Sequence, residues 1–229
     1  MHNSLLMNLL TPLGDSHYST SIRTMKKNDF VNAHWHNYFE FEVILDGKTE
    51  HTYNEYTYIA EKGSAYLLGF YDFHAVKALE DTTFLNITFD ANSLDRHISN
   101  ILAMGNGNGI CELNDNEIDY IKERVNILNT EESNNEPFSS QLRRSVLTEI
   151  IICILRKTLS DDTQKTPSLI QQTVSYMHTH FREEISLKDL SKQLTVSVNH
   201  LGVLFKKHIK MSFHTYLNIL RLKYACELL

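Results

Sequence analysis

Between residues 38 and 89, short stretches of β-branched and aromatic residues alternate with polar residues or cluster together. These stretches are YFEFEVIL, TEHTYNEYTYI, SAYLLGF and TTFLNITF, and turn signals such as Asp46-Gly47 and Lys62-Gly63 separate them. Short strands at regular spacing with turns between them are typical of an all-β barrel or sandwich. Residues 1–110 are therefore predicted to form a β-barrel domain.

The hydrophobic period becomes helical after the glycine-rich break MGNGNG at residues 104–109. Asn114 or Asp115 is placed to cap a first helix, and the polar loop NTEESNNEP separates it from a second helix over 138–159. Residues 111–159 are therefore predicted to be a helical segment. The apolar positions of the first helix are Ile118, Ile121, Val125 and Leu128.

The second helix carries more apolar surface than packing against a small barrel would bury. The excess predicts either an interface through which the protein forms a homodimer or a helix of the core, and the pattern leaves both open. The apolar positions concerned are Leu142, Val146, Ile150, Ile151, Ile154 and Leu155.

Residues 160–168, SDDTQKTPS, have the polar, proline-containing composition of a linker. Beyond it, residues 169–229 predict a leading helix, the short helix LKDLSKQL, a tight connection and a further helix. Ser186 with Asp189 resembles a capping box, and Ser197 is placed to cap the last of these helices. A short helix, a tight turn and a second helix with an amide and lysines outward match the motif that enters the major groove.

The outward face of this second helix suits double-stranded DNA. Lysines there fit phosphate contacts, and an amide and an imidazole fit base edges, although an ordinary three-helix bundle with solvated lysines is the alternative. From residue 168 onward there are eight Lys/Arg against four Asp/Glu, whereas the whole chain has a net charge of −6. The residues predicted to contact DNA are Ser197, Asn199, His200, Val203, Lys206 and Lys207.

Residues 185–229 resemble the first helix-turn-helix and linker helix of the AraC/XylS family of bacterial transcription factors. The matching parts are LKDLSKQL, LFKKHIKMSFHTYL and Arg221-Leu222 followed by Ala225. The resemblance implies an α+β protein with a cupin-like sensor domain, in which a small-molecule effector controls DNA binding. A sugar is the commonest effector in the family, and RNA polymerase is a partner if the protein is an activator.

Three departures from the family pattern bear on DNA binding. Gly202-Val203 stand where the family often has Ser-Arg, and Lys210 replaces a usual glycine. The chain also ends at Leu229, inside the linker helix, whereas the family continues into a second helix-turn-helix. Because counterion release scales with the number of phosphate contacts, this chain is expected to bind DNA weakly. A truncated partner that inhibits a full-length regulator is an alternative function.

Residues 34–47 resemble the first cupin motif, with His34 and His36, then Glu40 and Gly47 at matching intervals. A partial second match places His74 eleven residues after a glycine. The resemblance implies that three imidazoles and one carboxylate project into one barrel, and such a set suits Fe, Mn, Ni or Zn. If residues 34–40 form a regular strand, alternate side chains share one face.

These side chains have two interpretations. In one, His34, His36, Glu40 and His74 bind a transition metal, and the protein is a metal-dependent cupin enzyme with a helical appendage. In the other, which we favour, there is no cofactor and no catalysis, and the same side chains line an effector pocket. The pocket is predicted to comprise His34, His36, Tyr38, Glu40, Tyr58, Tyr66 and His74.

The composition narrows the class of protein. Over 229 residues, 42% are hydrophobic and 22% charged, which is ordinary for a globular protein. No apolar run approaches the ~20 residues that span a bilayer, so no membrane partner is expected. The three widely spaced cysteines fit reduced thiols in a cytoplasm better than disulfides.

Overall fold

The computed structural model describes residues 17–34, 36, 38–53, 56–69, 72–103, 107–134, 136–159, 169–209 and 211–227. The chain divides into two compact units, Met1–Thr163 and Gln164–Leu229. The predicted linker at residues 160–168 and the first part of the predicted break, residues 104–106, lie outside the described residues.

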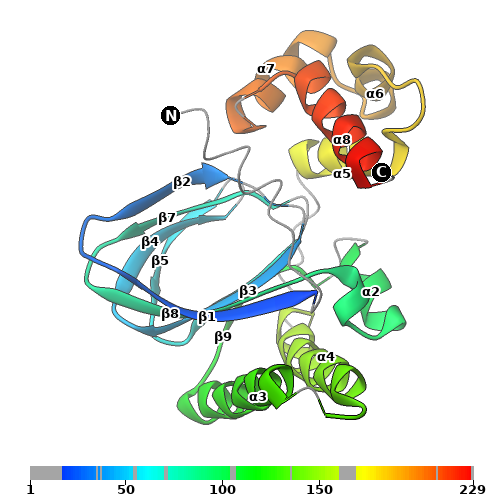
Figure 1. Ribbon diagram of the computed structural model, residues 1–229. Coiled ribbons are helices and arrows are strands. Elements are labelled where there is room, and N and C mark those ends of the chain that lie inside the picture. The colour runs from blue at the N-terminus through cyan, green and yellow to red at the C-terminus, as the bar shows by residue number, and fades with distance from the viewer. Residues whose placement is uncertain are drawn as a thin grey trace. The chain divides into compact units, whose positions relative to one another are not determined.

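The strands of the first unit form two antiparallel sheets that face each other (Figure 1). One sheet has the order β1-β8-β3-β6-β9 and the other the order β2-β7-β4-β5. The strands are β1 Tyr18–Met25, β2 Phe30–His34, β3 Phe39–Asp46, β4 Lys48–Tyr53, β5 Tyr56–Glu61, β6 Ser64–Leu68, β7 His74–Ala78, β8 Thr82–Phe89 and β9 Gly109–Glu112.

The α+β class with a β-rich first half, whose strand pattern was typical of a barrel or a sandwich, is confirmed. Among the strands described, the two sheets share no ladder, so the architecture is a sandwich. The predicted boundary at residue 110 falls inside β9, which pairs with β6 from Ser64↔Glu112 to Leu67↔Gly109. The strands and the following helices therefore share one unit.

Helices follow the strands in the first unit: η1 Ala91–Ser93, α2 Arg96–Ala103, α3 Asp115–Asn134 and α4 Ser139–Thr158. Asn114 caps α3, because its side-chain oxygen accepts from the Glu117 backbone N–H at 3.1 Å and the Glu117 carboxylate accepts from the Asn114 N–H at 2.9 Å. The polar loop predicted over 129–137 is wrong in its first part, because α3 continues to Asn134.

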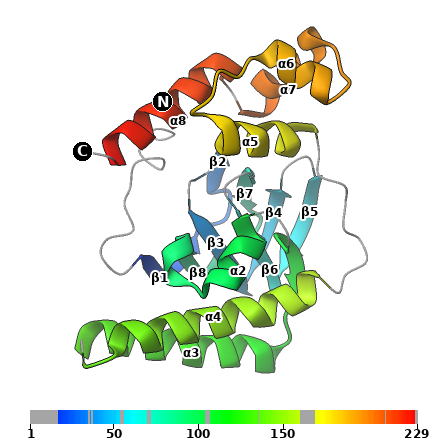
Figure 2. The same ribbon diagram turned by 90° about the vertical axis from the view of Figure 1, so that its right-hand side faces the viewer.

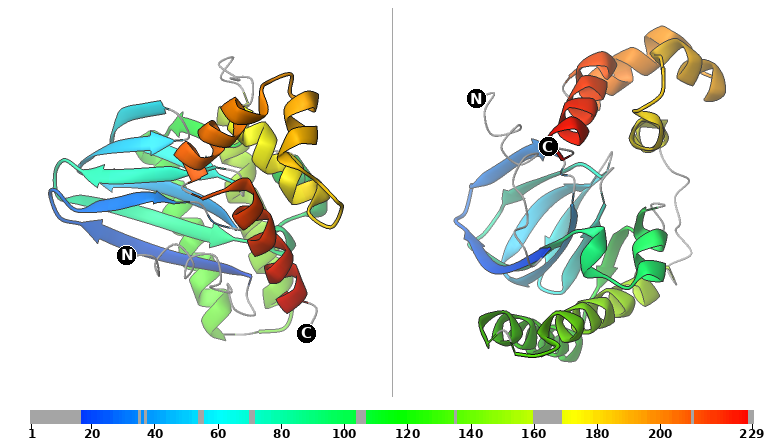
Figure 3. Two further views of the ribbon diagram at one scale, coloured as in Figure 1. Left: turned by 90° about the horizontal axis from the view of Figure 1, so that it is seen from above. Right: turned by 45° about the vertical axis from the view of Figure 1, so that its right-hand side comes forward.

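Helices α3 and α4 lie side by side along one face of the five-stranded sheet (Figures 2 and 3). Strand β3 alternates accordingly: Phe39 and Phe41 belong to the apolar core shared with the helices, while Ile44 belongs to a separate cluster with Tyr66. Of the apolar positions predicted on α4, only Leu142 is exposed, at 44%. The others are buried in this core, and dimerisation through α4 stays a prediction.

The second unit contains α5 Leu169–His180, α6 Leu187–Gln193, α7 Val198–Ile209 and α8 Phe213–Glu227. Ser186 caps α6 and Ser197 caps α7, as the sequence predicts. Between these two helices Thr195 has a φ of 57°, which allows the tight turn. Leu204 of α7 is only half-buried. The core of the unit includes Ile170, Val174, Met177, Leu190, Leu201, Phe205, Ile209, Phe213, Tyr216, Leu217 and Leu220.

Candidate functional site

The histidines and the glutamate of the cupin-like motif come from both sheets. His34 ends β2 and pairs in register with His74 of β7, while Glu40 lies in β3 of the opposite sheet. His36 lies in the segment that joins β2 to β3. The expectation of one regular strand over residues 34–40 is therefore wrong, because the chain crosses from one sheet to the other within it. The side chains nevertheless converge.

Their polar atoms form one buried cluster. The Glu40 Oε2 atom lies 2.9 Å from His36 Nε2 and 3.4 Å from His74 Nε2. His74 Nε2 also lies 3.1 Å from His34 Nε2. On the far side of the carboxylate, Asn86 Nδ2 donates to Glu40 Oε1 at 2.5 Å. Ligand atoms of His36, Glu40 and His74 all lie within 4.8 Å of one another, which is close enough to share a metal ion.

Glu40 supplies the negative charge of this cluster. Burial by itself raises the pKa of its carboxyl, but the hydrogen bond and charge of His36, followed by His74 and Asn86, outweigh burial and hold the pKa well below its usual range. Burial lowers the pKa of His34 and of His74 below that of free histidine. The cluster therefore combines an ionised carboxylate with two imidazoles, those of His34 and His74, that resist protonation.

Tyr38 supports the cluster from its edge. Its backbone carbonyl accepts a hydrogen bond from His36 Nδ1 at 2.7 Å, and its ring stacks on the His36 ring with centroids 4.3 Å apart. Burial, followed by the charge of Glu40, raises the pKa of the Tyr38 hydroxyl to about 12. Tyr38 thus fixes the position and tautomer of His36 and remains a neutral phenol.

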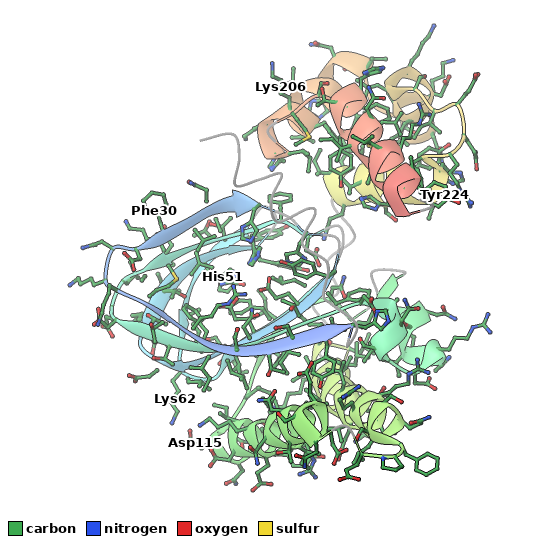
Figure 4. All side chains as sticks on the ribbon, in the orientation of Figure 1. Phe30, His51, Lys62, Asp115, Lys206 and Tyr224 are labelled. Carbon is green, nitrogen blue, oxygen red and sulfur yellow. The ribbon has the colours of Figure 1, made fainter. Side chains whose placement is uncertain are left out.

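A second group of buried polar side chains lies between the sheets, around His51 of β4 (Figure 4). The His51 ring stacks on Tyr66 of β6 with centroids 3.8 Å apart, and Tyr58 of β5 stacks farther off at 5.8 Å. Burial lowers the pKa of His51 to about 3, so its imidazole is neutral at pH 7. In the part of the chain described, no hydrogen-bond partner is found for Thr49 Oγ1, His51 Nδ1 and Nε2, Tyr58 OH or Tyr66 OH.

Several members of this interior were not predicted. The pocket prediction included Tyr58 and Tyr66 but missed Thr49, His51 and Glu42. A signal was present in β4, where Thr49 and His51 lie at alternate positions with the exposed Glu50 between them. Glu42 is buried on β3, and burial followed by the Glu40 charge raises its pKa to about 8. Because like charges cannot both ionise in such a site, Glu42 is the neutral partner of Glu40.

A surface groove of about 500 Å³ lies between α3 and α4. Glu117 and Lys157 line it and pair with each other at 2.8 Å, and Lys157 also donates to the Glu112 carbonyl at 2.9 Å. None of the predicted site residues lines the groove.

The residues predicted to contact DNA lie at the start and along one side of α7. The Ser197 hydroxyl accepts from the His200 backbone N–H at 3.1 Å, so it is used as a helix cap. The other predicted residues, Asn199, His200, Val203, Lys206 and Lys207, are exposed, and Figure 4 labels Lys206. Lys210 lies outside the described residues.

Comparison with known proteins gives one family match. The AraC-like ligand binding domain matches residues 17–158. Similar proteins include the HTH-type transcriptional activator RhaS of Enterobacter sp. (strain 638), which is 20% identical over 202 residues, or 86% of this chain and 73% of RhaS. RhaS of Pectobacterium atrosepticum is 21% identical over 196 residues, or 82% of this chain and 70% of RhaS.

Among solved structures, apo ToxT from Vibrio cholerae matches with a TM-score of 0.50 and 13% identity, covering 93% of this chain and 82% of ToxT. At this identity the likeness concerns the fold alone. In the described portion of the chain, no helix has the length and apolar content needed to cross a membrane.

Proposed function

The chain belongs to the AraC-like ligand binding domain family, and on this basis we propose that it is a one-component transcription regulator. A small molecule binds between the sheets of the first unit, and the helix-turn-helix of the second unit binds DNA. Binding of the effector changes the affinity for DNA, which requires that the two ligands favour different states of the same chain.

The observation that carries the effector site is the group of unpartnered polar atoms around His51. Buried polar groups in proteins nearly always have hydrogen-bond partners, so several orphans in one place point to a ligand that supplies them. Two phenols, one alcohol and a neutral imidazole offer both donors and acceptors. The flanking rings of His51, Tyr58 and Tyr66 add stacking faces.

These groups favour a neutral molecule with several hydroxyl groups, such as a sugar. Each ligand hydroxyl both donates and accepts, which matches the mixed character of the orphan atoms. The ionised Glu40 and the absence of a buried Lys or Arg among the described residues disfavour an anion. A ligand that carries a carboxylate is therefore expected to fit this site less well than a sugar.

Thermal-shift and calorimetric titrations with a panel of monosaccharides, and with a short-chain fatty acid as the anionic contrast, test this proposal. We expect at least one saccharide to raise the melting temperature and to alter binding to a double-stranded DNA probe. Tyr66→Phe removes one orphan hydroxyl and should weaken saccharide binding by about tenfold. Tyr176→Phe, in the second unit, is the matched control and should leave it unchanged.

Binding of the fatty acid but of no saccharide would contradict the proposed effector class. Equal saccharide affinity in the Tyr66→Phe variant and the wild type would place the site elsewhere. A saccharide that binds without any change in DNA affinity would contradict the regulatory role.

On α7, the exposed lysines Lys206 and Lys207 make phosphate contacts, while Asn199 and His200 reach base edges. The basic charge of the second unit supports this assignment. The RhaS proteins that the chain resembles are described as HTH-type transcriptional activators, which agrees with DNA as a partner.

A further inference from the structure

We propose that Val203 of α7 determines part of the DNA sequence specificity of the second unit, by contacting the 5-methyl group of a thymine in the major groove. The inference rests on the proposed function, because it assumes that α7 meets DNA. It concerns the pair Gly202-Val203, at which this chain departs from the pattern of the family it resembles. The proposed function assigns roles to polar residues of α7 and none to Val203.

Val203 lies at the centre of the exposed face of α7. Leu201 and Phe205, two positions before and after it, are fully buried, whereas 62% of Val203 is exposed. Residues two positions apart on an α-helix lie roughly 200° apart around the axis, so Val203 points away from the core of the unit. One turn away on either side are Asn199 and Lys207, both exposed. Val203 therefore stands between the residues proposed to contact bases and phosphates.

The valine contributes little to the free chain. Its exposed side chain buries little apolar surface, so it gains little from the hydrophobic effect. Its branched Cβ also makes it a poorer helix former than alanine. An apolar side chain at the centre of a polar face gains its favourable contacts only when a partner with an apolar group covers it.

Gly202 fixes the direction in which Val203 points. A Cβ atom at position 202 would lie 3.2 Å from Leu187 Cδ2 of α6, so the glycine allows α6 to pack closely against α7. The start of α7 is fixed as well, because the Ser197 hydroxyl accepts from the His200 backbone N–H. These two contacts hold the rotation of α7 about its axis and keep Val203 on the outer side.

The chemistry of the major groove selects the partner of this side chain. Valine neither donates nor accepts hydrogen bonds, and the one apolar group that a base pair presents in the groove is the thymine 5-methyl. Cytosine at the same place presents an amino donor, which valine would cover without accepting from it. Asn199, one turn earlier, suits an adenine edge. The two residues together favour neighbouring A·T pairs.

Exchange of thymine for deoxyuridine tests the inference, because it removes the 5-methyl group and leaves the hydrogen-bonding groups in place. Duplexes that bind the whole chain are selected from a random library at low salt, and each thymine of a selected duplex is replaced singly. Fluorescence anisotropy measures the affinity of each duplex. We expect one replacement to weaken binding to the wild type about fourfold, as the loss of one buried methyl contact implies.

Variants of Val203 assign that methyl contact. Val203→Ala should bind the thymine and deoxyuridine duplexes equally, and so should Val203→Ser. Val203→Thr keeps one of the two methyl groups and should retain a preference for thymine. Val198→Ala is the matched control: it removes another exposed valine of α7, five positions earlier, and should keep the full wild-type preference.

Equal wild-type affinity for thymine and deoxyuridine at every position would overturn the inference and leave the proposed function standing. A thymine preference that persists in Val203→Ala would also overturn it, because another residue would then make the contact. Failure of the wild type to bind any duplex at low salt would contradict the proposed function itself, and the inference with it. The base exchange on wild-type protein needs no variant, so the result does not depend on how the variants fold.

Discussion

At the scale of single residues, His51 shows how burial changes the pKa of a side chain. Its ring is fully buried beside the rings of Tyr58 and Tyr66, and both ring nitrogens are unpartnered in the described part of the chain. The ionisable groups facing it are Glu40 of β3, His34 of β2 and His74 of β7, besides the two tyrosines. Only Glu40 favours the protonated ring, and burial outweighs it, lowering the pKa to about 3.

His51 should therefore destabilise the fold in acid. Between its ordinary pKa of 6.5 and about 3, the unfolded chain binds a proton that the folded chain does not. Stability contributed by the neutral ring is thus present at high pH and is lost as the pH falls through this window. The unfolding free energy of the wild type should fall as the pH is lowered from about 7.5 to about 5. We expect this fall to be about 2 kcal/mol smaller in the His51→Phe variant.

Urea denaturation at the two pH values measures the unfolding free energy of each protein. Comparing the change with pH, and not the absolute values, removes any constant effect of the larger phenylalanine ring. His97→Ala, which removes an exposed histidine, should keep the wild-type pH dependence. Equal pH dependence in His51→Phe and the wild type would mean that burial does not lower the pKa of His51 in the folded state.

At the scale of elements, the ends of the helices are determined by side chains that bond to nearby backbone. Asn114 and Glu117 cap α3 reciprocally, and Ser186 and Ser197 cap α6 and α7. These contacts span three residues, which is why the sequence pattern was sufficient to predict them. The end of α3 was not predicted, because a polar stretch can continue a helix as well as leave it.

Asn114→Ala should reduce the unfolding free energy of the first unit by roughly 1 kcal/mol, because the orphan N–H groups of the first turn lose their acceptor. Asn116→Ala is the matched control: it removes the same residue type two positions later, inside α3, and should be neutral or slightly stabilising. Chemical denaturation of the two variants side by side measures the difference. Equal stability would show that the cap contributes nothing.

At the scale of the whole molecule, charge is distributed unevenly between the two units. The chain is acidic overall, with a net charge of −6, while the residues from 168 onward are basic. Electrostatic attraction to phosphate should therefore depend on lysines of the second unit and not on those of the first.

The double variant Lys206→Ala, Lys207→Ala should bind a double-stranded DNA probe more weakly and with a shallower salt dependence. Each lost phosphate contact reduces the slope of log affinity against log salt by about 0.9. Fluorescence anisotropy across a salt series measures this slope. Lys77→Ala, an exposed lysine of β7, should leave both affinity and slope unchanged. An unchanged slope in the double variant would exclude α7 as the phosphate-contacting helix.

The sequence by itself determined the strand-rich front, the helical segments, the caps and the helix-turn-helix pattern. Each of these depends on residues within a few positions of one another, because hydrophobic period and capping are local properties. The exposed face of α7 was predicted for the same reason, since helical spacing alone assigns its inward and outward sides.

Only the tertiary structure decided what meets between the sheets. His34 and His74 are 40 positions apart and Glu40 and Asn86 are 46 apart, and they meet because of strand register and the facing of two sheets. No local pattern encodes either property, so the sequence predicted the histidines from a motif but missed Asn86 and His51. The order of the strands in the two sheets was not predicted for the same physical reason: which strands share hydrogen bonds is set by packing over the whole unit.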